Sequence, residues 1–323
     1  MKKKLLLIAL MVVMPFNIYA YSNKIIVGGD TIGIEVHSNG VYVVGFYDVI
    51  NKSIAKNAGF KIGDIIIKIN DKKIDNINSL NKMIEEDKEY TFTVLRENKE
   101  KDIKFKLEKE DNLIKTGLYV KDQINGIGTL SYIDPETRIF GSLGHEIFES
   151  SSMTKFNIKD GVIYKAEVKS IKKSTNGTAG EKQADYDKNS SAGSINKNEQ
   201  NGIFGKYLNE LPDNEKFEVA TKSEVKKGAA YIKTVINKDE VDTFDINIIS
   251  IDEGNTVKNI LFEIVDEELL KKTGGVIQGM SGSPIIQNNK IIGVVNYVIL
   301  NETNKGYGVF ITTMLEEGDK LVN

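Results

Sequence analysis

A serine flanked by glycines stands near the C-terminal end of this 323-residue chain, in Gly279-Met280-Ser281-Gly282-Ser283-Pro284, and an apolar run follows it. Flanking glycines allow a tight turn that directs backbone N–H groups inward. Those of Gly279 and Ser281 would then face the oxygen of a carbonyl attacked by the Ser281 hydroxyl. We therefore predict a serine nucleophile with an oxyanion hole. A Gly/Ser-rich turn without chemistry is the alternative.

The candidates for a general base are few, because the chain has only two histidines, His37 and His145. It has no cysteine, which excludes disulfides and a cysteine nucleophile, and two distant histidines argue against a zinc site. His145 precedes Ser281, as in the His–Asp–Ser order of trypsin-like proteases. An α/β-hydrolase would need its histidine after the nucleophile. We predict His145 as the base, with His37 as its competitor.

A third residue, a carboxylate, should orient the histidine. Among 46 acidic residues, spacing alone selects none. Asp266 is the candidate, since it ends the apolar run Ile260–Val265 shortly before the nucleophile. A helix N-cap is the other interpretation of Asp266, and a Ser–Lys dyad with Lys290 or Lys305 is the other interpretation of the mechanism.

Composition and the N-terminus bound the class of protein. The net charge of −3 gives no basic surface for nucleic acid, and 40% hydrophobic residues suffice for a core. Lys2, Lys3 and Lys4 precede an apolar run, Leu5–Met14, which is shorter than the roughly 20 residues of a membrane span. Residues 1–20 are therefore predicted to be a signal peptide or membrane anchor, and the protein to be exported.

Residues 24–109 are predicted to form a small α+β domain. Short apolar runs at 40–45, 64–69, 90–95 and 103–107 read as strands, and a helix is expected from Asn78 or Ser79. The segment Ala58-Gly59-Phe60-Lys61-Ile62-Gly63-Asp64-Ile65-Ile66 resembles that of bacterial PDZ domains. The resemblance implies capture of a peptide terminus along an edge strand, here at Ile32, Gly33 and Ile34. A domain that only packs against its neighbour is the alternative.

Residues 113–323 are predicted to be almost entirely β. Apolar runs alternate with Gly and Asp turns, which favours a barrel or sandwich. Residues 172–200 contain no Leu, Val, Phe or Met, so a flexible polar insertion is expected there. The predicted fold is mainly β, a PDZ domain followed by a trypsin-like double β-barrel.

Several segments together resemble the stage IV sporulation protein B family. They are Ile127-Gly128-Thr129-Leu130, Asp134-Pro135-Glu136-Thr137, Phe140-Gly141-Ser142-Leu143-Gly144-His145, Asn201-Gly202-Ile203-Phe204-Gly205, Gly306-Tyr307-Gly308-Val309-Phe310-Ile311 and the whole run from Thr273 to Gln287. The family's catalytic residues fall on His145, Asp266 and Ser281. Where the family more often has Thr-His-Val after the last barrel strands, this chain has Asn296-Tyr297-Val298.

The resemblance implies a membrane-associated serine endopeptidase that needs no cofactor or metal. Such enzymes act between the two membranes of a forespore. They cleave the regulatory partner of an intramembrane protease complex, which releases processing of a late sigma factor, and they tend to cut themselves between the signal segment and the PDZ domain. The alternative function is a PDZ peptide-binding regulator with a non-catalytic barrel.

Overall fold

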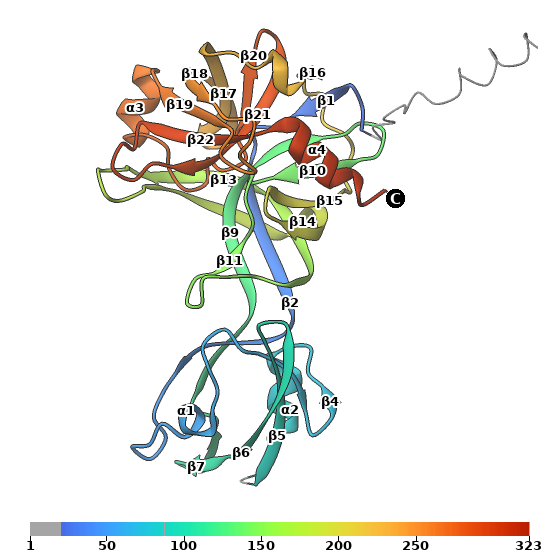
Figure 1. The fold of residues 1–323 in the computed structure, drawn as a ribbon, viewed down its shortest axis with the longest axis vertical. Coiled ribbons are helices and arrows are strands. Elements are labelled where there is room, and N and C mark those ends of the chain that lie inside the picture. The colour runs from blue at the N-terminus through green and yellow to red at the C-terminus, as the bar shows by residue number, and fades with distance from the viewer. Residues whose placement is uncertain (1–20, 87, 323) are drawn as a thin grey trace, which may run out of the picture.

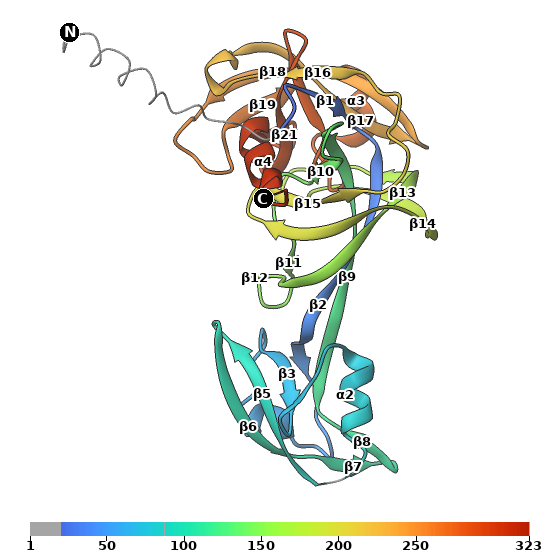
Figure 2. The same ribbon diagram turned by 90° about the vertical axis from the view of Figure 1, so that its right-hand side faces the viewer.

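A computed structural model of the protein describes residues 21–86 and 88–322. Its chain forms a larger and a smaller body joined by two long neighbouring strands, β2 (Thr31–Phe46) and β9 (Leu118–Ile133), as Figures 1 and 2 show. The predicted signal segment at residues 1–20 lies outside the described residues. Within the described ranges, no helix is long and apolar enough to cross a membrane.

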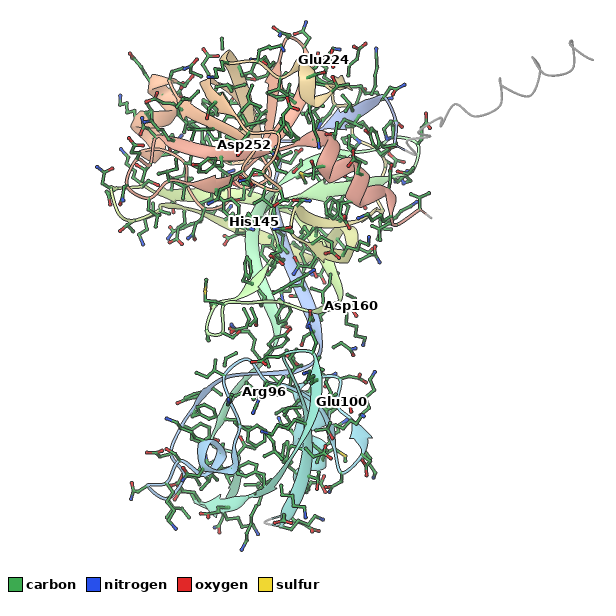
Figure 3. The ribbon with its side chains drawn as sticks, viewed as in Figure 1. Arg96, Glu100, His145, Asp160, Glu224 and Asp252 are labelled. Atoms are coloured by element: carbon green, nitrogen blue, oxygen red, sulfur yellow. The ribbon has the colours of Figure 1, made fainter. Side chains whose placement is uncertain are left out.

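The smaller body is an α+β unit. Its elements are the second half of β2, α1 (Ile54–Ala58), β3 (Ile65–Ile69), β4 (Lys72–Lys73), α2 (Ile77–Met83), β5 (Glu89–Arg96), β6 (Lys99–Lys106), β7 (Glu108–Glu110) and β8 (Leu113–Lys115). The rings of Phe60, Phe92 and Phe105 meet edge to face in its core. Asp64, buried before β3, accepts two bonds of 2.6 Å from the guanidinium of Arg96 (Figure 3). The Gly-Asp-Ile-Ile motif thus begins the strand β3 and also supplies the carboxylate that pairs with Arg96 of β5.

The helix of this body starts slightly before the predicted position. Asn76, not Asn78 or Ser79, is the N-cap of α2, and its side chain accepts from the N–H of Ser79 at 2.8 Å. The Ser79 hydroxyl in turn accepts from the N–H of Asn76. This reciprocal capping box satisfies two free donors of the first turn, which fixes the start of the helix.

The first half of the larger body is a closed ring of strands. Each pairs with the next in the order β2, β9, β10 (Ile139–Ser142), β15 (Gly202–Tyr207), β14 (Glu181–Glu199) and β13 (Ile158–Lys172), which returns to β2. Phe140, Ile163 and Ile195 are fully buried in its interior. This ring is the first barrel.

The second half is another closed ring. Its order is β17 (Gly228–Asn237), β18 (Glu240–Ile251), β19 (Ile260–Ile264), β22 (Lys305–Phe310), β21 (Lys290–Val298) and β20 (Pro284–Gln287), which returns to β17. Ile246, Phe262 and Ile285 fill it. The predicted double β-barrel is confirmed.

The remaining elements cover or connect the two barrels. An apolar cluster around Ile25, Tyr132 and Met314 contains side chains from β1, β9 and the C-terminal helix. The elements of the larger body outside the two rings are β1 (Lys24–Val27), β11 (Phe148–Glu149), β12 (Thr154–Lys155), β16 (Lys216–Val219), the short 3₁₀ helix η2 (Lys222–Glu224), α3 (Glu267–Thr273) and α4 (Ile311–Asp319).

The predicted flexible insertion at residues 172–200 is wrong, because Glu181–Glu199 is the strand β14, hydrogen-bonded to β13 and β15. The buried positions of this strand include Ala192, Gly193 and Ile195. Because only one of these three is a large apolar residue, the composition of the segment looks polar. A strand with partners on both sides satisfies its backbone through the ladder and needs little apolar surface of its own.

The predicted start of the PDZ domain at Lys24 and its peptide-binding edge at Ile32, Gly33 and Ile34 are also corrected. β1 pairs with β16 and β9 of the larger body. Ile32, Gly33 and Ile34 pair with β9 on one side and with β13 on the other. Because both edges are occupied, this segment offers no free backbone to a peptide.

Candidate active site

The two barrels bring His145 and Ser281 to one cavity of about 810 Å³. His145 follows β10 of the first barrel, and Ser281 precedes β20 of the second. Buried Thr129 of β9 links the barrels at this point, because its N–H donates to the Ser281 carbonyl at 2.9 Å and its hydroxyl to the Gly279 carbonyl at 2.7 Å. Figure 3 shows His145 at the lower side of the larger body.

The ring of His145 is held in one tautomer. Its Nδ1 lies 2.8 Å from the carbonyl oxygen of Glu146, which can only accept, so Nδ1 carries the proton and Nε2 a lone pair. The ring stacks on Tyr297 with centroids 5.5 Å apart and planes 25° apart. Burial lowers the pKa of His145. The neutral imidazole, with its lone pair on Nε2, is therefore the form favoured at pH 7.

The hydroxyl of Ser281 donates to the carbonyl of Asn296 in β21 at 3.1 Å. The side-chain amide of Asn296 donates to the carbonyls of Val257 at 2.6 Å and Gly144 at 3.4 Å. One residue of β21 thus contacts both the loop of the nucleophile and the loop of the histidine. Among the hydrogen bonds of the described residues, none joins this hydroxyl to His145.

Two backbone donors beside Ser281 face no protein acceptor. Among the hydrogen bonds of the described chain, the N–H groups of Gln278, Met280 and Gly282 each donate to a backbone carbonyl, whereas those of Gly279 and Ser281 do not. The alternation arises because Gly279 has φ of +92°, which turns its peptide plane. A Cβ at Gly279 would lie 3.1 Å from the side chain of Lys182. Gly279 and Ser281 both line the cavity, where an oxyanion hole would have to lie.

Asp266 lies apart from this pair. It is the N-cap of α3, and its carboxylate accepts from the N–H of Leu269 at 2.8 Å. Among the described residues that line the cavity Asp266 does not occur, and within those residues no hydrogen bond joins it to His145. The structure thus brings together two of the three predicted catalytic residues.

The competing candidates are on the surface. His37 contacts Asp160 at 2.7 Å and Glu35 at 3.3 Å, and it does not line the cavity. The amine of Lys290 is paired with Glu224 and Glu218, and that of Lys305 with Glu302. Neither lysine reaches the cavity, so the geometry gives no support to a Ser–Lys dyad.

Lys182 is a residue near the site that the sequence analysis missed. It is 4% exposed, and its amine donates to the hydroxyls of Thr234 at 2.9 Å and Thr31 at 3.3 Å. Its backbone N–H donates to the carbonyl of Gln278, the residue before Gly279, at 2.9 Å. Burial lowers the pKa of Lys182 to about 7. Nothing in the sequence marks this lysine among its many exposed neighbours.

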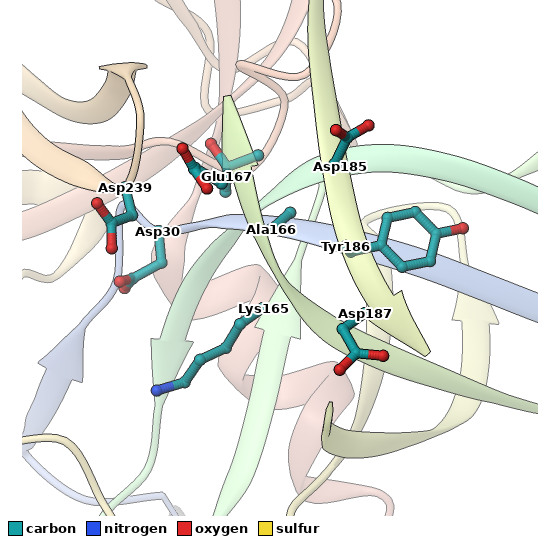
Figure 4. Close-up of a pocket in the computed structure, with 9 residues that line it drawn as sticks. Asp30, Lys165, Ala166, Glu167, Asp185, Tyr186, Asp187 and Asp239 are labelled. Atoms are coloured by element: carbon teal, nitrogen blue, oxygen red, sulfur yellow. The ribbon is translucent and has the colours of Figure 1, made fainter. Parts of the chain in front are cut away.

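A second cavity, of about 550 Å³, lies where β2, β13 and β14 meet and shares no lining residue with the first (Figure 4). It is acidic, and burial raises the pKa of Asp30 in its wall. In the part of the chain that the structure describes, no group of three His, Cys, Asp or Glu side chains could hold a metal ion. The charged residues in its lining are Asp30, Lys165, Glu167, Asp185, Asp187 and Asp239.

Two family models match the sequence. One, described as SpoIVB peptidase S55, matches residues 112–315, and the other, a PDZ domain, matches residues 31–107. The chain belongs to the SpoIVB peptidase S55 family. This S55 peptidase is a serine endopeptidase with a PDZ domain, as the sequence resemblance implied. No curated protein sequence matches the S55 peptidase chain.

The solved structures to which the chain is similar include those of a protease from M. tuberculosis, Rv3671c. The inactive form of Rv3671c protease has 12% identity and a TM-score of 0.34, with 61% of this chain and 84% of that chain covered. The active form has 12% identity and a TM-score of 0.34, with 61% and 74% covered. Human heparin binding protein has 8% identity and a TM-score of 0.33, with 61% and 85% covered. Likenesses of this size identify no shared substrate.

Proposed function

We propose that the S55 peptidase cleaves peptide bonds with Ser281 as nucleophile and His145 as general base. The observation that carries the proposal is one cavity lined by His145, Gly279 and Ser281. The histidine is neutral, and the N–H groups of Gly279 and Ser281 donate to no acceptor of the described chain. No other described histidine reaches that cavity. Gly279 and Ser281 N–H are the proposed oxyanion hole.

The reaction follows from these positions. The Ser281 hydroxyl rotates from Asn296 toward Nε2 of His145, gives up its proton and attacks the scissile carbonyl. The carbonyl oxygen becomes an oxyanion that accepts from the N–H groups of Gly279 and Ser281. His145, now an imidazolium with Nδ1 held by Glu146, donates its Nε2 proton to the leaving amine. Water, activated by the same nitrogen, then releases the acyl group.

Asp266 is proposed as the residue that orients His145, on the strength of its match to the family's pattern. In the structure the Glu146 carbonyl fills that position at Nδ1, and Asp266 caps α3. The proposal therefore requires the N-terminus of α3 to release the carboxylate when the site assembles. Its test is argued in the Discussion.

The substrate proposed from the family resemblance is a membrane-associated regulatory protein of sporulation signalling, cleaved after export into the space between the forespore membranes. Residues 1–20 would hold the peptidase at the membrane or be removed, and self-cleavage would occur before the PDZ domain. The PDZ domain would capture or gate the substrate. Because Ile32, Gly33 and Ile34 are paired on both sides, gating through contact with the peptidase domain fits the geometry better than capture at that segment.

Fluorophosphonate labelling of the full-length protein tests the catalytic assignment, with the labelled peptide located by mass spectrometry. We expect label on Ser281 that is lost in Ser281→Ala and in His145→Ala. His37→Ala is the matched control, since it removes the other histidine from the surface, and it should label normally. Turnover of a peptide should fall by several orders of magnitude in Ser281→Ala while the melting temperature is kept. Label that persists in Ser281→Ala, or that never forms on folded protein, would overturn the proposal.

A further inference from the structure

The cavity that holds Ser281 and His145 is apolar along most of its wall. Its polar side chains are those of Ser281, His145, Asn296, Tyr297 and Gln278, and Glu146 is its one carboxylate. The rest of the lining is glycine or aliphatic and aromatic side chains from both barrels and from the strands that lead to the smaller body. An acidic substrate side chain would lose its hydration here without finding a partner of opposite sign, and Glu146 is the one group of the described lining that could pair with a basic side chain.

One apolar group of the lining lies beside the nucleophile. Val276 and Ile277 precede Ser281 in the chain, and Val298 and Leu300 follow Asn296, which holds the Ser281 hydroxyl. Each segment is bonded to a neighbouring loop, because the N–H of Val276 donates to the Thr303 carbonyl at 2.7 Å and that of Gly177 to the Leu300 carbonyl at 2.7 Å. The apolar wall on the side of the nucleophile therefore consists of Val276, Ile277, Val298 and Leu300, and we call it the Val276–Val298 slot.

A second apolar group lies on the side of the histidine. Ile147 and Phe148 follow His145, and Met153 stands at the end of the same β11–β12 hairpin, which projects between the two bodies in Figure 2. The Phe156 N–H donates to the Ile147 carbonyl at 2.9 Å and closes the hairpin. Ile34 and Ile124 of the joined strands complete this side.

Three of these side chains are exposed in a way that folding alone does not explain. Phe148 is 40%, Met153 73% and Leu300 48% exposed, and all three face the same cavity. Large apolar side chains gathered at an open cleft mark a surface that a ligand covers. Here the ligand is the substrate chain.

We propose that the S55 peptidase cleaves between apolar residues, with the side chain before the scissile bond in the Val276–Val298 slot and the one after it against Phe148 and Met153. This inference rests on the proposed function. The direction follows from the chemistry, because His145 must donate its proton to the leaving amine, which places the residue after the bond on the histidine side.

The test uses the full-length protein and a set of quenched-fluorescence peptides that vary one residue at a time on either side of one scissile bond. Leu or Phe at either position should give kcat/KM about 10- to 100-fold above Ala, as expected for added methylene groups in an apolar pocket. Asp should be poorer still, and Lys should remain below Leu and Phe, because Glu146 is the one carboxylate of the described lining that could pair with it. Cleavage beside charged residues at equal or higher kcat/KM would overturn the inference.

Variants assign the two sides. Val298→Glu should reduce kcat/KM at least tenfold for peptides with Leu before the bond, and Met153→Lys should do so for peptides with Leu after it. Leu208→Lys, which changes a leucine that is 58% exposed outside the cavity, is the matched control and should leave kcat/KM as it is. Fluorophosphonate labelling separates the two hypotheses. Labelled variants with no change in preference refute the apolar sites, whereas absence of label on the wild-type protein refutes the proposed function itself.

Discussion

At the scale of single residues, the surroundings of His145 suit the general base that we propose. Burial lowers its pKa below the ordinary 6.5, and the Glu146 carbonyl fixes the proton on Nδ1. The neutral form is the active one, so activity is lost only as pH falls through the lowered pKa. We expect the acidic limb of kcat/KM to lie below pH 6.5, measured with a peptide that carries no titrating group. A limb above pH 6.5 would mean that His145 is not the base in the free enzyme.

Lys182 gives a second prediction at this scale, on stability. Its pKa falls from the ordinary 10.5 to about 7 on folding, so between those values the unfolded chain binds more protons and the free energy of unfolding rises with pH. Lys182→Met removes this dependence. The free energy of unfolding of the variant minus that of the wild type should be larger at pH 7 than at pH 10, by up to about 4 kcal/mol. Urea unfolding at both pH values measures this difference.

Exposed Lys173 is the matched control, because Lys173→Met removes an amine without emptying a buried site. Its free energy of unfolding should differ from the wild type by about the same small amount at both pH values. If Lys182→Met tracks the wild type from pH 7 to pH 10, the amine is charged inside the protein, and the buried pair of threonine hydroxyls is not its whole environment.

At the scale of elements, α3 poses the sharpest question, because Asp266 has a structural task in it. Asp266→Asn keeps an oxygen that can accept from Leu269 N–H but loses the carboxylate, whereas Asp266→Ala loses both. If Asp266 orients His145, Asp266→Asn should lower kcat by about 10³- to 10⁴-fold at nearly unchanged stability. Asp266→Ala should in addition lose about 1 kcal/mol of stability through the missing cap.

Activity and urea unfolding of the two variants separate the roles. Wild-type turnover in Asp266→Asn would show that the Glu146 carbonyl alone holds the imidazole and that Asp266 is a cap. The comparison is informative because the two substitutions differ only in whether the cap survives.

The elements also show what a single sequence contains and what it lacks. That Ser281 and His145 line one cavity could be predicted, because glycines, chain order and a scarcity of histidine all limit the choices. The strand β14 could not, since its ladder partners lie in β13 and β15 and leave no mark on its own composition. The paired state of Ile32, Gly33 and Ile34 was missed for the same reason, because a PDZ-like pattern does not reveal that β13 occupies the edge. Asp266 as an N-cap was an open alternative from local sequence alone.

At the scale of the whole molecule, the smaller body contacts the β11–β12 hairpin beside the active-site cavity. Tyr42, buried where β2 enters the smaller body, stacks on Phe156 with ring centroids 4.8 Å apart, and its hydroxyl accepts from the Asn157 N–H at 2.8 Å. Lys121 of β9 lies 3.6 Å from the buried carboxylate of Glu149. Contacts from β2 and β9 at the PDZ domain thus hold the hairpin that carries Phe148 and Met153. The position of the PDZ domain is therefore linked to the shape of the cleft.

Tyr42→Ala should therefore loosen the cleft without touching the nucleophile. We expect faster amide hydrogen exchange in residues 148–157, because both the ring stack and the hydroxyl contact are lost, and a several-fold lower kcat/KM on peptides that extend past the scissile bond. Tyr42→Phe keeps the stack and should give a smaller change. Tyr119→Ala, which removes a 56% exposed ring that contacts Tyr47 rather than the hairpin, is the control. Unchanged exchange at 148–157 in a folded Tyr42→Ala protein would mean that the hairpin is held by the peptidase domain alone, and that the smaller body cannot gate the site through it.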